Sequence, residues 1–79
     1  MKVKIYSLTN GLEIYDDIKI IRIISEDYNL LILKDYMPII GQINGSFEIE
    51  SESIHKKINV DEAYYVNHEN VFELLVKES

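Results

Sequence analysis

Histidines and closely spaced carboxylates are the residues of this chain whose types could support chemistry. His55 and His68 fall in expected turns, without a partner histidine at the spacing of a metal site, so we interpret them as solvated. Glu48, Glu50 and Glu52 recur at every second position and would share one face of a strand. Three such carboxylates could hold a hard cation such as Ca²⁺. The interpretation we favour is a charged solvent face that protects a strand edge from aggregation.

Two acidic pairs, Asp16-Asp17 and Glu26-Asp27, could be proposed as a general acid and base. Catalytic carboxylates need a cleft that shifts their pKa, whereas these pairs fall in expected turns, where Asp caps the backbone and stays solvated. The chain has three glycines in total and therefore no glycine-rich phosphate loop. We expect no catalytic residue, no metal site and no cofactor, and we expect that the protein is not an enzyme.

Composition narrows the class of protein further. The 79 residues make one domain, 1–79, with a formal net charge of −6. That charge argues against nucleic acid and against docking on anionic lipid, which both need a basic face. The chain has no cysteine, no apolar run of 18 residues and no signal-like run after Met1. A cytoplasmic protein without direct membrane insertion is the expectation.

The apolar residues favour β structure. There are 14 Ile, seven Leu, five Val, six Tyr and two Phe, against a single Ala at position 63. β-Branched and aromatic side chains suit a half-buried pleated surface, and the strongest helix former is nearly absent. The tyrosines could equally belong to the core or to an interaction surface, because Tyr is intermediate in burial and enriched at interfaces.

Turn signals divide the chain into short strands. Asn10-Gly11 and Asn44-Gly45 each predict a tight hairpin turn in which both residues adopt positive φ. The segment Leu30–Leu33 is continuously apolar, as in a strand covered on both faces, and Pro38 marks a loop or strand edge. The segment 61–63 predicts a corner. The expected strands are 3–5, 12–15, 18–24, 30–33, 39–43, 47–51, 57–60, 64–66 and 71–76.

The spacing of these strands and turns predicts an all-β fold. Eight to ten short, mostly antiparallel strands with a turn every few residues are typical of a flattened β-sandwich or barrel. We expect the core to come largely from Leu30–Leu33, Phe47, Ile49 and the segment 71–75.

The whole chain also resembles the N-terminal β-sandwich of the epsilon subunit of F-type ATP synthases. That family has a "GILPGHAPL" motif followed by "ALKPGVLRI", and the segments 31–39 and 41–49 here stand in their places without a gap. The segments 59–66 and 69–75 stand in the places of the family's "AVSGGFVEV" and closing "DNKVTVLA" strands. Pro38, Gly45 and the apolar alternation carry the likeness.

The resemblance implies where a partner binds, and this sequence departs from the family motifs at those places. The family's Pro-Gly-His is replaced by Lys34-Asp35-Tyr36, and an acidic residue before the "LGI" strand is replaced by Asn29. These places resemble the contacts of epsilon with the rotor ring. The resemblance therefore implies a partner contact at Asn29, Lys34, Asp35, Tyr36 and Met37.

The function implied is that of a non-catalytic subunit in the central rotor stalk, which contacts the gamma subunit and the membrane ring. Its location would be the cytoplasm, or the inner face of the membrane through the complex. The family usually continues into a C-terminal two-helix hairpin that can inhibit ATP hydrolysis, whereas this sequence stops at Ser79. If the chain is full length, that inhibition is absent. The alternative is a stand-alone interaction module that kept the β-sandwich and has no role in ATP synthase.

Overall fold

Seven strands account for the regular structure of the protein. The computed structural model describes residues 1–77 and contains no helix in that range, so no helix there could span a membrane. This confirms the all-β prediction. The strands are β1 Lys2–Ser7, β2 Gly11–Tyr15, β3 Ile20–Ser25, β4 Asn29–Ile32, β5 Ile39–Glu50, β6 His55–His68 and β7 Val71–Lys77.

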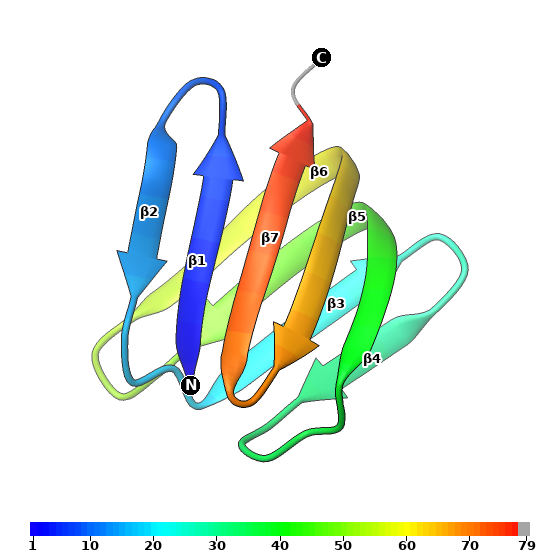
Figure 1. Ribbon diagram of the computed structural model, residues 1–79. Helices are drawn as coiled ribbons and strands as arrows, with labels where there is room; N and C mark the ends of the chain where they lie inside the picture. Colours follow the sequence, from blue (N-terminus) through cyan, green and yellow to red (C-terminus); the bar gives the residue numbers. More distant parts are fainter. Residues whose placement is uncertain (78–79) are drawn as a thin grey trace.

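The strands form one sheet in the order β2-β1-β7-β6-β5-β3-β4. All neighbours are antiparallel except β1 and β7, which are parallel. Figure 1 shows how β5 and β6 sweep from one layer into the other, so that the sheet folds over on itself as a sandwich. The strands β2 and β4 end the sheet and are not paired with each other, so within residues 1–77 it is open and not a closed barrel.

The described chain has seven strands where nine were expected, because β5 and β6 each join two of the expected strands into one long strand. The expected corner at 61–63 lies inside β6, where Asp61 and Glu62 oppose the single residue Asn44 of β5. Such a β-bulge increases the local twist without ending the strand. Each long strand thereby serves both layers.

The second predicted hairpin turn, at Asn44-Gly45, is wrong. Both residues lie inside β5, and neither has a positive φ. Gly45 is required for a different reason, since a Cβ atom there would run into the carbonyl oxygen of Ile24 on β3. The first predicted turn, at Asn10-Gly11, is confirmed, although only Gly11 uses a positive φ, of 69°.

The core lies between the two layers and joins them through aromatic rings. Phe72 of β7 stacks on Tyr65 of β6 and on Phe47 of β5, with ring centroids 5.3 Å apart in both pairs. Fourteen apolar residues of the described chain are buried around them, at positions 3, 5, 18, 21, 23, 32, 43, 47, 49, 60, 63, 65, 72 and 74.

The expected covering of Leu30–Leu33 on both faces is wrong. Only Ile32 is fully buried, while Leu31 and Leu33 are about half exposed. The physical reason is that β4, like the other strands of the sandwich, has the core on one face only, so its side chains alternate between core and solvent.

Candidate protein-interaction surface

The outer face of the layer formed by β2, β1, β7 and the second half of β6 is the main candidate surface. Strand pairing aligns its side chains in rows, because residues opposite each other point to the same side of a sheet. One row runs Leu12, Tyr6, Leu75 and Tyr64, from β2 to β6. The sheet itself therefore assembles an apolar surface from four segments of the chain.

A second row lies beside the first. Val66 of β6 pairs with Ile40 of β5 and with Glu73 of β7, and Glu73 pairs with Lys4 of β1, which is opposite Ile14. Ile40 is 79% exposed, the second highest value among the large apolar side chains. The row is apolar at its ends and carries one Lys and one Glu at its centre.

Several apolar side chains on this face are well exposed. Leu12, Ile14 and Leu75 are each more than half exposed, and Tyr64 and Val66 are exposed by 46% and 43%. A shallow hollow within the face is lined by Tyr6, Ile40, Tyr64, Val66, Glu73 and Leu75. Contiguous apolar surface of this kind marks sites where proteins dock. The opposed Lys and Glu would fix the orientation of a partner.

The tyrosines divide between the core and the surface, the two locations that the sequence left open. Tyr65 is buried in the core, and burial together with its hydrogen bond to Tyr28 raises the pKa of its hydroxyl. Tyr64, its neighbour in β6, points to the outer face, where its hydroxyl donates to Glu62 at 2.6 Å. The alternation of the strand decides between core and surface.

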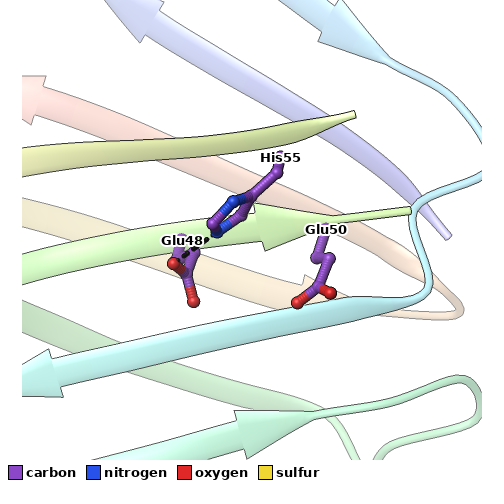
Figure 2. Close-up of side chains that lie close together, drawn as sticks. All are labelled: Glu48, Glu50 and His55. Carbon is purple, nitrogen blue, oxygen red and sulfur yellow. Dashed lines mark hydrogen bonds and ion pairs between the residues drawn. The ribbon is translucent and has the colours of Figure 1, made fainter. Parts of the chain in front are cut away.

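The outer face of the other layer is mainly charged, although Ile24 and Leu31 are also exposed on it. Arg22 of β3 pairs with Glu48 of β5, which pairs with Lys57 of β6, so opposite charges sit side by side across three strands. The Arg22 guanidinium donates to Glu48 Oε1 at 3.0 Å and to Glu50 Oε2 at 2.6 Å. Figure 2 shows Glu48 and Glu50 on the same side of β5, with His55 of β6 beside Glu48.

These side chains are the closest approach to a metal site among the described residues. Ligand atoms of Glu48, Glu50 and His55 lie within 4.8 Å of one another, and His55 Nε2 is 2.6 Å from Glu48 Oε2. Arg22 already supplies the positive charge between the two carboxylates. We therefore interpret the cluster as a cross-strand ion-pair network, which stabilises a sheet surface.

Two expectations for this cluster are wrong. Glu52 lies beyond β5 and does not share the face of Glu48 and Glu50. Glu48 and Glu50 also do not protect an unpaired strand edge, because at these positions β5 pairs with β3 on one side and with β6 on the other. The sequence could not reveal that Arg22, 26 residues away from Glu48, is the partner.

We expect the stability of the protein to fall on acidification. Hydrogen bonds from His55 and then Arg22 lower the pKa of Glu48 below its ordinary value of 4.5, and those from Tyr15 and Lys56 lower that of Glu13. A carboxylate with a lowered pKa stabilises the folded state fully above the ordinary value and loses that contribution as the pH falls through the folded-state value. The melting temperature should therefore drop between about pH 5 and about pH 3.

The variant Glu48→Gln tests whether Glu48 contributes to this loss of stability at acidic pH. The variant should lose less melting temperature over the acidic range than the parent, because the titrating group is gone. Glu52→Gln is the control, since Glu52 makes no ion pair among residues 1–77. An acid-induced drop that is identical in all three proteins would contradict the prediction.

The five residues that the family resemblance implied as a partner contact do not form one patch. Asn29 begins β4, whereas Lys34, Asp35, Tyr36 and Met37 form the loop after that strand ends. In Figure 1 the two places are at opposite ends of β4. The loop is held by β6 and its turn into β7.

Specific hydrogen bonds hold this loop in place. The backbone N–H of Asp35 donates to Asn70 Oδ1 at 2.7 Å, and Asn70 Nδ2 donates back to Asp35 Oδ1 at 3.0 Å. The side chain of Asn67 is buried and donates to the carbonyl of Met37 at 3.3 Å. Met37 is 65% exposed, whereas Tyr36 is half-buried and packs against the core. Of the two expected anchors, Met37 is free to reach a partner.

The structure does not bring the remaining acidic residues and His68 together into one site. Asp17 has a positive φ of 58° in the connection before β3, and Asp16 pairs loosely with Lys2 at 3.8 Å. His55 and His68 are the first and last residues of β6. No arrangement of a nucleophile, base or acid pair emerges in the described part of the chain.

Sequence reasoning missed the apolar outer face, although a signal was present. The segments 64–66 and 74–76 are apolar at consecutive positions. On a strand, such a run must place apolar side chains on both faces. What was missing was the strand order that puts these outward residues next to Leu12 and Ile40.

No protein-family model matches this chain, and no curated protein sequence matches it significantly. A solved structure does. The chain superposes on a chain in the cryo-EM structure of the central stalk and c-ring of the mitochondrial ATP synthase of Tetrahymena thermophila, with a TM-score of 0.79 and 15% sequence identity. The match covers 99% of this chain and 63% of the other. At that identity, the likeness shows a shared fold.

Proposed function

We propose that the protein is a non-catalytic, epsilon-like subunit in the central rotor stalk of an F-type ATP synthase. It acts by binding proteins, and no cofactor is part of the proposal. It binds a gamma-like stalk subunit through the apolar outer face of β2, β1, β7 and β6. The end of the sandwich that carries the loop 34–37 faces the membrane ring. The protein is then peripheral to the membrane, held there by the complex.

The single observation that carries the proposal is the contiguous apolar outer face. Leu12, Leu75, Tyr64, Val66 and Ile40 are exposed together on one side of a folded domain, while the opposite outer face is mainly charged and has Ile24 and Leu31 as its exposed apolar residues. A monomeric protein rarely exposes such a patch without a partner. The shared fold supports the identity of that partner as a stalk component.

The loop 34–37 is proposed as the second contact. Met37 supplies an exposed, adaptable side chain, and Pro38 restricts the loop, so less entropy is lost on binding. Lys34 and Asp35 are exposed beside it, and Tyr36 supports them from the core side. Asn29 can belong to this contact only if the partner also reaches the opposite end of β4.

Co-purification tests the proposal. The tagged protein, expressed in its own cells, should bring down stalk and ring subunits of the ATP synthase. The double substitution Tyr64→Ser with Leu75→Ser should reduce that recovery by about tenfold or more, because it removes two side chains from the centre of the face. Mass spectrometry of the eluate is the measurement.

The matched control is Leu31→Ser. Leu31 is 50% exposed, close to the 46% of Tyr64, but lies on the outer side of the other layer. Leu31→Ser should leave the recovery of both stalk and ring subunits unchanged. Met37→Ser should reduce the recovery of ring subunits more than that of stalk subunits. Recovery of unrelated proteins through the same face would replace the proposal with the stand-alone interaction module.

A further inference from the structure

The first half of β5 has an unpaired edge. Residues 39–43 pair with β6 on one side, but β3 begins to pair with β5 only at Gly45, opposite Ser25. In Figure 1 the first half of β5 crosses in front of β4 and does not run alongside β3. Within the described chain, no strand therefore covers this side of residues 39–42.

The backbone groups on this edge can be assigned. In an antiparallel pair, a residue points both its N–H and its C=O either toward the partner strand or away from it, in alternation. The carbonyl of Gln42 points away from β6, because it accepts the Tyr28 hydroxyl at 2.6 Å. Ile40, two residues earlier, has the same orientation. The N–H and C=O of Ile40 and the N–H of Gln42 are thus available to another strand.

A groove runs along the edge. Its apolar wall comes from Leu30 and Ile39, and Tyr28 and Tyr65 close it beside Gln42, where their hydroxyls are 3.0 Å apart. The other wall is the turn between β3 and β4, in which Glu26 and Asp27 are both exposed. The site combines an open strand edge, one apolar wall and two carboxylates.

We propose that this edge binds an extended, basic segment of another protein by strand addition. The segment would pair its backbone with Ile40 and with the N–H of Gln42, whose carbonyl keeps its bond to the Tyr28 hydroxyl. It would place an apolar side chain against Leu30 and a Lys or Arg beside Glu26 and Asp27. This site is separate from the loop 34–37, and the inference does not depend on the stalk function.

Charge decides between the possible occupants. The groove carries two carboxylates, and the whole chain has a net charge of −6. A second copy carries the same net charge of −6 and the same acidic turn at its own edge, so that edge offers these carboxylates no basic partner. A basic strand meets the same carboxylates with attraction. The chemistry of the site therefore selects a cationic extended peptide.

The probe is a synthetic peptide, acetyl-Lys-Val-Arg-Ile-Lys-amide, added to the full chain and followed by NMR. Binding should slow amide hydrogen exchange at Ile40 and Gln42 in a saturable manner, and added salt should weaken it. A peptide with Glu in place of Lys and Arg should not bind. The basic peptide methylated on every backbone nitrogen should lose the protection, because neither of its edges can then donate to a neighbouring strand.

Glu26→Gln with Asp27→Asn should weaken binding of the basic peptide roughly two- to tenfold, the range expected when two exposed ion pairs are lost. Glu52→Gln with Glu69→Gln removes the same charge from other turns and should leave binding unchanged. Protection at the edges of β2 or β4 instead, or equal binding of the acidic peptide, would overturn the proposal. So would protection that rises with protein concentration in the absence of peptide.

Discussion

Phe72→Ala should destabilise this protein by about 3–5 kcal/mol, the range measured for deleting a buried aromatic ring. Phe72 is fully buried and stacks on Phe47 and Tyr65, so it contacts both layers of the sandwich. A domain of 79 residues has a total stability of about 4–12 kcal/mol. The variant should therefore unfold at a much lower urea concentration, or fail to fold at 37 °C.

Two variants control for this result. Phe72→Leu keeps much of the volume and should cost roughly 1–2 kcal/mol. Leu75→Ala, on the same strand but 56% exposed, should change the free energy of unfolding by less than about 0.5 kcal/mol. Equal losses for Phe72→Ala and Leu75→Ala in urea titrations would mean that the ring is not at the centre of the core.

Gly45→Asn should be the second most damaging substitution, with a loss of about 3 kcal/mol. The added Cβ would collide with the carbonyl oxygen of Ile24 and press on Ser25, whose Cα would be 3.2 Å away. Both obstacles are backbone atoms in a paired strand, so they cannot move aside without breaking the pairing of β3 with β5. Urea or thermal unfolding measures the loss.

Asn is the informative substitution because it tolerates a positive φ. If residues 44 and 45 formed a tight turn, Gly45→Asn would be nearly neutral; in a crowded strand it cannot be. Gly11→Asn is the matched control, since Gly11 has a φ of 69° and an added Cβ meets nothing within 4 Å. It should lose less than about 1 kcal/mol. A larger loss at Gly11 than at Gly45 would refute the strand assignment.

Local pattern was sufficient for the fold class and for much of the core. The bias toward Ile, Val and Tyr, with alternation of apolar and polar residues, predicted an all-β chain, because side-chain period and β-branching act within a single strand. Phe47, Ile49, Phe72 and Leu74 are buried as expected. The turn ending at Gly11 was also predictable, because its geometry depends on one residue's φ.

Tertiary structure alone decided what each of the other signals means. Asn44-Gly45 has the composition of a turn, but the approach of Ile24 from β3 makes the same glycine part of a strand. Leu31 became a surface residue because it points to the outer face of its layer, on the same side as Arg22.

The candidate surface depends on strand order in the same way. Leu12 is far in sequence from Tyr64 and Leu75, and the three form a row only because β1 and β7 pair in parallel and bring β1 and β2 beside the hairpin of β6 and β7. The charged face depends on Arg22 meeting Glu48 across 26 residues. Alternation along a strand tells which residues share a face, but only the pairing of distant strands tells which faces become one surface.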